Sequence, residues 1–147
     1  MTKKIYISWS DFHQHTKELC KKIKEHGHFD KIVAVSRGGL IPAGVIAYEL
    51  NIRNNEAVNF SSYDSHYNRR DDEDIEISGH VGNVNEKTLI IDDLSDSGRT
   101  FKILKAVYPQ ACFVSVYAKE QGADITDIFA KKMPDEWIVF PWDVEEE

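Results

Sequence analysis

Cysteine, long apolar runs and basic charge are all scarce in this sequence of 147 residues. Its two cysteines, Cys20 and Cys112, lie in apolar-patterned segments and match no metal-binding spacing, which predicts reduced, buried thiols in a cytoplasmic protein. No apolar run approaches the roughly 20 residues of a membrane-spanning helix, and the stretch MTKKIYISWS lacks the apolar core of a signal peptide. Without repeats or low-complexity linkers, the chain is expected to form one domain over residues 1–147.

Positive charge is in the minority, because 18 lysines and arginines face 25 aspartates and glutamates, giving a net charge of −7. This balance argues against a general nucleic-acid-binding protein, so no nucleic acid is expected as a partner. Hydrophobic residues make up 41% of the chain and charged residues 29%. Such a composition is typical of a globular domain with a real core.

Apolar runs of strand length and segments of helical periodicity follow one another along the chain, which favours an α/β fold. We expect a mostly parallel, twisted sheet with helices on both faces. The run Ile32–Val35 is apolar throughout, as a strand covered on both faces should be. Further strands are expected at 57–62, 75–78, 89–91 and 112–118, and an extended segment at 5–9. Helices are expected from a Ser8 or Ser10 cap to Glu25, from Pro42 to Leu50, and from Thr100 to the residue before Pro109.

The stretch Leu89–Thr100, LIIDDLSDSGRT, carries the strongest functional signal. It predicts a buried strand that ends in Asp92 and Asp93, then a short loop, then a helix. Ligands of open α/β sheets sit beyond the carboxyl ends of strands, and the free N–H groups of a helix start suit a phosphate. Gly98 lets the backbone approach an anion closely, and the two carboxylates suit sugar hydroxyls or Mg²⁺. The hydroxyl donors for phosphate oxygens are Ser95, Ser97 and Thr100.

Both strand-end loops of this sequence must be weighed against ordinary turns. A plain strand, turn and capped helix would account less well for the full set of carboxylates, glycine and hydroxyls in Leu89–Thr100. A second loop, Ser36-Arg37-Gly38-Gly39, could bind phosphate oxygens through the guanidinium of Arg37 and through glycine N–H groups. Alone it is better explained as a glycine-rich turn with a surface arginine, but beside the first stretch the anion-binding interpretation is favoured.

Three further candidates each have a plain structural alternative. Lys119 follows a strand and could donate to a carbonyl oxygen of a base, although a strand-end lysine is more often simply at the surface. Trp137 offers a face for stacking a planar base and Ile138 a backbone carbonyl beside it, although tryptophan usually packs in a core. The polar run Ser65–Asp74, which contains Arg69, predicts a mobile loop or a solvated charged hairpin.

The motifs SRGGLIPA, SSYD, IDDLSDSG, YAK and WIVFPWD resemble, in order and spacing, those of the type I purine phosphoribosyltransferases, in particular their bacterial xanthine-guanine members. In that family's central motif, two acidic and two variable residues precede Asp-Thr-Gly and a hydroxyl residue; Ser97 keeps the hydroxyl where threonine is commoner. The resemblance implies the type I phosphoribosyltransferase fold, with a small hood from the chain termini, including residues 137–143, over the base. It also implies a cis peptide bond between Ser36 and Arg37.

The resemblance further implies the residues that bind substrates. The donor would be 5-phosphoribosyl 1-pyrophosphate (PRPP), with Mg²⁺ as cofactor on the side of Asp93, and Asp96 would be the catalytic acid/base that exchanges a proton with purine N7. The PRPP-binding residues would be Ser36, Arg37, Gly38, Arg69, Asp92, Asp93, Leu94, Ser95, Asp96, Ser97, Gly98, Arg99 and Thr100. The purine-binding residues would be Asp96, Lys119 on the 6-oxo group, Trp137 stacked on the ring, Ile138 at the 2-substituent, and Asp143.

The implied reaction transfers the 5-phosphoribosyl group to N9 of guanine, xanthine or hypoxanthine and releases pyrophosphate. A homo-oligomer, dimer or tetramer, is implied, in the cytoplasm with at most peripheral association with the inner membrane. Two features depart from the family pattern: Glu120 stands where relatives carry proline, and the tail Glu145–Glu147 is more acidic than theirs.

Two other classes of protein remain as alternatives. A non-catalytic regulator of the same fold would sense PRPP and bind nucleic acid, which the acidic charge disfavours. A Rossmann-like or flavodoxin-like binding protein would need a glycine fingerprint after its first strand, and SRGG does not fit G-x-G-x-x-G.

Overall fold

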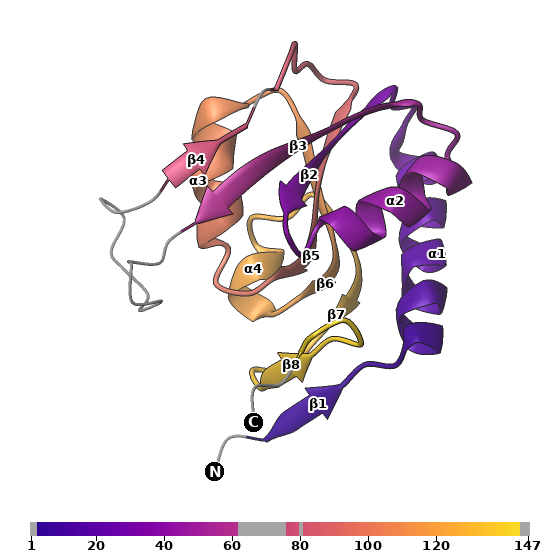
Figure 1. Ribbon diagram of the computed structural model, residues 1–147, viewed down its shortest axis with the longest axis vertical. Helices are drawn as coiled ribbons and strands as arrows, with labels where there is room; N and C mark the ends of the chain where they lie inside the picture. Colours follow the sequence, from indigo (N-terminus) through magenta and orange to yellow (C-terminus); the bar gives the residue numbers. More distant parts are fainter. Residues whose placement is uncertain (1–2, 62–75, 80, 145–147) are drawn as a thin grey trace.

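The computed structural model describes residues 3–61, 76–79 and 81–144, which form a six-stranded sheet, a two-stranded sheet and four helices (Figure 1). The strands are β1 (Lys4–Tyr6), β2 (Lys31–Ser36), β3 (Asn54–Ser61), β4 (Glu76–Ser78), β5 (Thr88–Ser95), β6 (Cys112–Ala118), β7 (Ile128–Lys132) and β8 (Trp137–Val139). The helices are α1 (Trp9–His26), α2 (Leu40–Glu49), α3 (Arg99–Val107) and α4 (Glu120–Ala123).

The large sheet has the strand order β4-β3-β2-β5-β6-β7, and only β4 runs antiparallel to its neighbour. From β2 the chain moves outward to β3 and β4, then returns to β5 and moves outward on the other side to β6 and β7. The direction of winding therefore reverses between β2 and β5. In open α/β sheets such a reversal opens a crevice at the carboxyl ends of the two strands.

The central strands are buried on both faces because helices cover each side of the sheet. Figure 1 shows α1 and α2 on one side and α3 on the other. Successive residues of β2 alternate between two separate cores: Ile32 and Ala34 pack on the side of α1 and α2, and Val33 and Val35 on the side of α3. The continuous apolar run of this strand thus predicted its surroundings correctly.

Helix α1 begins one residue after Ser8, whose hydroxyl oxygen accepts a hydrogen bond of 3.0 Å from the N–H of Asp11. Ser8 is therefore the N-cap, and Ser10 lies inside the helix. The buried stripe of α1 consists of Phe12, Thr16, Leu19, Cys20 and Ile23. Neither α1 nor any other helix in the described ranges combines the length and the apolar character that a membrane crossing would require.

A small second layer, the hood, is formed by β1 and β8, which pair in parallel with Ile5 opposite Ile138. It lies beside α1 and below the large sheet in Figure 1. Phe140 and Trp142 stack with ring centroids 4.7 Å apart, and Trp142 meets the ring of Phe12 edge to face at 4.9 Å. These aromatic contacts fix the end of the hood to α1, as the expected hood from the chain termini requires.

Several expectations about the elements were wrong in detail. Helix α2 begins at Leu40, before the expected Pro42, and β3 begins at Asn54, before the expected residue 57. The segment 5–9 is not extended throughout, because Trp9 already belongs to α1. Strand β5 does not end at Asp92 and Asp93 but continues to Ser95, because β6 pairs with it as far as Ser95 and Ala118. Strand β7 was not expected, since its sequence IFAKK ends in two exposed lysines at the edge of the sheet.

Candidate active site

The candidate site lies where β2 and β5 separate. Their pairing ends at Ala34 and Ile91, whereas β5 stays paired with β6 up to Ser95. Beyond this point β2 leads into the loop 36–39 and β5 carries its carboxylates. The sheet reversal therefore places both predicted anion-binding loops on the two sides of one crevice.

The loop after β2 approaches the carboxylates closely. The peptide bond between Ser36 and Arg37 is cis, as expected, and the side chain of Arg37 is exposed. A Cβ added at Gly38 would lie 2.7 Å from Cγ and Oδ1 of Asp93 and closer still to Oδ2. Only glycine fits here, because its backbone lies directly against this carboxylate. The two loops thus form a single site.

Asp92 and Asp93 are half-buried and adjacent, and backbone donors hold them in place. The Asp93 N–H donates to Oδ1 of Asp92 at 2.8 Å, and the Leu94 N–H donates to Oδ1 of Asp93 at 2.7 Å. Burial raises the pKa of Asp92 well above its usual range, and the charge of Asp93 adds to the rise. Burial also raises the pKa of Asp93, and the charge of Asp143 acts in the same direction. This concentration of negative charge favours a bound cation or hydroxyl donors.

The carboxylate pair suits a Mg²⁺ ion that is shared with a ligand. Mg²⁺ takes oxygen ligands, keeps several waters, and is often held by one or two carboxylates together with substrate phosphates. Asp92 and Asp93 supply such oxygens. Within residues 3–61, 76–79 and 81–144, no group of three or more histidine, cysteine or acidic side chains could hold a metal by itself. Asp92 and Asp93 could thus supply two of the oxygen ligands of a Mg²⁺ ion.

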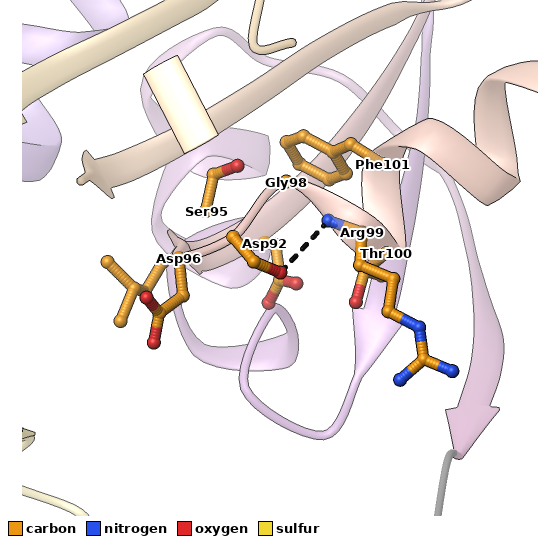
Figure 2. A pocket seen from close by; sticks show the side chains of 9 residues that line it. Asp92, Ser95, Asp96, Gly98, Arg99, Thr100 and Phe101 are labelled. Atoms are coloured by element: carbon orange, nitrogen blue, oxygen red, sulfur yellow. Dashed lines mark hydrogen bonds between the residues drawn. The ribbon is translucent and has the colours of Figure 1, made fainter. Parts of the chain in front are cut away.

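The loop between β5 and α3 lines an open pocket (Figure 2). Gly98 has φ = 85°, a left-handed conformation that side-chain-bearing residues avoid, and it leads directly into α3. The hydroxyl oxygen of Ser97 accepts the Arg99 N–H at 3.3 Å, drawn dashed in Figure 2. Its own hydrogen is left for another acceptor. The pocket is lined by Asp92, Leu94, Ser95, Asp96, Ser97, Gly98, Arg99, Thr100 and Phe101.

Ser95 differs from the other hydroxyl residues of this loop. Its side chain is buried, and its hydroxyl donates to the carbonyl of Gly122 at 3.1 Å. Ser95 also accepts the Lys119 N–H at its own carbonyl, at 2.9 Å. The prediction that this hydroxyl donates to phosphate does not fit this geometry, because its hydrogen already holds α4 against β5.

Lys119 and Asp96, predicted from separate motifs, lie together. The Lys119 Nζ is 3.4 Å from both carboxylate oxygens of Asp96 and 3.8 Å from Oδ1 of Asp135. The Lys119 side chain is only 11% exposed, whereas that of Asp96 is 62% exposed and that of Asp135 fully exposed. A nearly buried cation thus faces two carboxylates from different loops. No motif in the sequence singles out Asp135, because a lone surface aspartate carries no pattern.

The predicted residues of the hood differ in their burial and in their hydrogen bonds. Trp137 is 62% exposed and does not pack in a core, while Ile138 is buried. The Trp137 N–H and the Val139 carbonyl both bond to the segment of β1, so the alternation of a strand directs the Ile138 N–H and C=O to the opposite side. The Asp143 carboxylate accepts the Phe140 N–H at 2.8 Å and holds the turn after β8. Arg69 lies outside the described residues.

The comparisons with known proteins agree with this geometry. Residues 6–147 match the family described as phosphoribosyl transferase domain. The chain is 41% identical over 143 residues to the xanthine-guanine phosphoribosyltransferase of Idiomarina loihiensis, covering 97% of this chain and 88% of that protein. It is 40% identical over 140 residues to the enzyme of the same name from Desulfotalea psychrophila, covering 95% and 86%.

Solved structures show the same fold. The purine phosphoribosyltransferase of Pyrococcus horikoshii superposes with a TM-score of 0.79 and 25% identity, covering 98% of this chain and 99% of that one. The xanthine-guanine-hypoxanthine phosphoribosyltransferase of Helicobacter pylori superposes with a TM-score of 0.78 and 24% identity, covering 97% and 95%. The expected type I phosphoribosyltransferase fold is confirmed. By its sequence over residues 6–147, its sheet and its relatives, this chain belongs to the phosphoribosyltransferase family.

Proposed function

We propose that this protein is a purine salvage enzyme that transfers the 5-phosphoribosyl group of PRPP to N9 of a 6-oxopurine: guanine, xanthine or hypoxanthine. The observation that carries the proposal is the contact of Gly38 with Asp93, which joins two anion-binding loops into one site. PRPP carries phosphate groups at two ends of one ribose, so its binding site needs two anion-binding loops next to each other. The names of the relatives from Idiomarina loihiensis and Desulfotalea psychrophila support the purine as acceptor.

On the PRPP side, each loop has a separate task in this proposal. The N–H groups and the guanidinium of the loop Ser36-Arg37-Gly38 bind the pyrophosphate, joined by Arg69. The start of α3 binds the 5′-phosphate, where free N–H groups and the positive end of the helix dipole favour an anion. Asp92 and Asp93 accept hydrogen bonds from the ribose hydroxyls. The 5′-phosphate segment comprises Leu94, Asp96, Ser97, Gly98, Arg99 and Thr100, while the buried Ser95 supports this loop through its hydrogen bond to the Gly122 carbonyl.

Asp93, with Asp92 beside it, would hold the Mg²⁺ that accompanies PRPP. The raised pKa of both carboxyls supports this assignment, because a bound cation offsets the cost of ionising two adjacent, half-buried groups. When bound, Mg²⁺ supplies positive charge that stabilises pyrophosphate as a leaving group. Activity is therefore expected to require Mg²⁺ and to be lost with a chelator.

On the base side, the proposal assigns one contact to each edge of the purine. Lys119 donates to the 6-oxo group, Trp137 stacks on the ring, and the Ile138 carbonyl accepts from the 2-substituent, with Asp143 beside it. The exposure of Trp137 and the outward direction of the Ile138 carbonyl support these roles. Asp96 exchanges a proton with N7, next to Lys119.

The reaction forms one bond and breaks one. The N9 lone pair attacks C1 of the ribose, and the C1–O bond to pyrophosphate breaks with its electrons on the leaving oxygen. The ribose passes through an oxocarbenium-like state, which nearby carboxylates stabilise. The proton lost by the purine passes to Asp96 through N7, so the product is a neutral base in a nucleoside monophosphate.

The proposal is tested by pyrophosphate release with PRPP and Mg²⁺ when guanine, xanthine, hypoxanthine and adenine are supplied separately. Turnover with the 6-oxopurines but not with adenine is the expected result. Binding of PRPP without turnover of any base would contradict the proposal and favour a regulator of the same fold. The preference among the three 6-oxopurines depends on how the site binds the 2-substituent. A difference of about 1–3 kcal/mol in that interaction is enough to decide it.

We also propose that the protein is a cytoplasmic homo-oligomer, a dimer or a tetramer. An exposed apolar face of α2 supports self-association: Leu40 is 47% and Tyr48 92% exposed, and no charged residue lies between them. A contiguous apolar surface is a common mark of a protein interface. Light scattering after size-exclusion chromatography would give the mass directly, and a monomer at micromolar concentration would contradict this assignment.

A further inference from the structure

Lys119 links three parts of the site that are distant in the sequence. Asp96 belongs to the loop between β5 and α3, Lys119 follows β6, and Asp135 lies between β7 and β8. The Met133 N–H donates to the Ala118 carbonyl at 2.8 Å, which fastens the start of the β7–β8 connection beside the residue before Lys119. Asp135 is therefore held near Lys119 by the backbone, and not only by its side chain.

A nearly buried ammonium group needs an opposite charge, because burial disfavours its charged form. Two carboxylates supply it here: Asp96 at 3.4 Å and Asp135 at 3.8 Å. Under the proposed function Asp96 takes up the proton of purine N7, and a protonated Asp96 no longer balances the charge of Lys119. Asp135 has no such task in the proposed reaction and can keep its contact with Lys119. It also lies two residues before Trp137, on the chain that leads into the hood.

We infer that Asp135 is a positioning residue for purine binding: it holds the Lys119 ammonium group toward the 6-oxo oxygen while Asp96 serves the proton at N7. This inference rests on the proposed function. It adds a carboxylate that links the hood to the lysine that contacts the base. Asp135 itself does not touch the purine.

The test compares Asp135→Asn with the wild-type protein in steady-state kinetics with PRPP, Mg²⁺ and hypoxanthine. The KM for the base is expected to rise about two- to fivefold, the range for a partly exposed charge pair, while kcat and the KM for PRPP change little. Asp135→Glu restores the charge and is expected to recover most of the affinity for the base. Asp124→Asn, which removes an exposed carboxylate at the end of α4, is the matched control and should leave all three constants unchanged.

Salt dependence separates a charge effect from a structural one. Salt screens exposed charge pairs. The KM for the base of Asp135→Asn, divided by that of the wild type, should therefore fall toward one as KCl is raised from ~50 mM to ~1 M. An unchanged base KM at low salt would overturn the inference. So would an equal rise in both KM values together with a lower thermal midpoint, which would assign Asp135 a structural role. Turnover by the wild-type protein is measured before any variant. If the wild type turns over no base, both the proposed function and this inference are refuted.

Discussion

At the scale of single residues, the site gathers negative charge where the proposed function requires groups that bind a sugar and a metal ion and exchange a proton. Asp92 and Asp93 lie side by side with raised pKa values, and Asp96 lies next to a nearly buried lysine. Their exposures differ: the first two are half-buried, whereas Asp96 is exposed. An exposed carboxylate can approach a substrate without disturbing the fold, which suits a proton carrier.

Replacing Asp96 with asparagine should therefore affect chemistry more than folding or PRPP binding. Asp96→Asn keeps the shape of the side chain but cannot carry the proton of N7. We expect kcat to fall about 10²-fold or more, as is typical for loss of a general acid/base, with the Kd for PRPP nearly unchanged. Turnover assays and isothermal titration with PRPP give the two quantities. Unchanged turnover would remove Asp96 from the mechanism.

Gly38 provides a second prediction at this scale, because a methyl group there would collide with the Asp93 carboxylate. Gly38→Ala should weaken PRPP binding at least about tenfold, since either the loop or the carboxylate must move. Gly27→Ala is the matched control: a Cβ at this position after α1 meets only the ring of Phe29, at 3.9 Å, so the PRPP affinity should stay unchanged. Equal PRPP affinity of Gly38→Ala and wild type would contradict the close approach of the two loops.

At the scale of elements, the site depends on where strands stop pairing. Strand β5 continues beside β6 for four residues after its pairing with β2 ends, and its carboxylates lie in this stretch, which is paired on one side. The sequence indicates the apolar run Leu89–Ile91 but not which neighbour pairs with the residues that follow. Extended pairing on one side makes Asp92 and Asp93 part of a rigid strand, so their positions are better defined than those of loop residues.

Helix α1 supports the hood, and its start is stabilised by Ser8. Ser8→Ala removes the acceptor for the Asp11 N–H and should lower the free energy of unfolding by about 1 kcal/mol in urea titrations. Ser10→Ala, inside the first turn and exposed, should change the stability much less. A larger loss for Ser10→Ala than for Ser8→Ala would show that the helix begins elsewhere.

At the scale of the whole molecule, the apolar core between the large sheet and helices α1 and α2 encloses both thiols. Burial raises the pKa of Cys20 to about 11 and that of Cys112 to about 12. At pH 8 both groups are protonated in the folded protein, and protonated, buried thiols react slowly. The expectation of reduced, buried cysteines is consistent with these positions.

Thiol labelling at pH 8 should therefore report global opening. We expect no rapid reaction of either cysteine with a disulfide reagent in the native protein and two equivalents in denaturant. Between an unfolded pKa of about 8.5 and the raised folded values, the folded state binds more protons, so stability should fall as the pH rises above about 9. Thermal midpoints at pH 8, 9 and 10 measure this slope. Fast labelling of one native thiol at pH 8 would contradict its burial.

Much of the fold followed from local patterns. The apolar run Ile32–Val35 predicted a strand covered on both faces, and the expected helix from a Ser8 or Ser10 cap to Glu25 matches α1 to within one residue at its end. Strand β7 was missed because its lysines do not follow an apolar pattern. It is a strand because β6 offers it a free edge, and because Lys22 of α1 donates to the carbonyls of Phe129 and Ala130 at 3.0 and 3.3 Å. Such long-range partners leave no trace in a local window of sequence.

The sequence by itself determined the chemistry that is present: two strand-end loops with carboxylates, glycines and hydroxyls, a lysine and a tryptophan, in an order that identifies the family. These depend on residue type and spacing, which a chain carries without folding. Only the tertiary structure decided that Gly38 lies against Asp93, that the Ser95 hydroxyl holds α4, and that Lys119 is placed between Asp96 and Asp135. Contacts between loops that follow different strands depend on sheet order and on where pairing ends, and both are set by the packing of the whole chain.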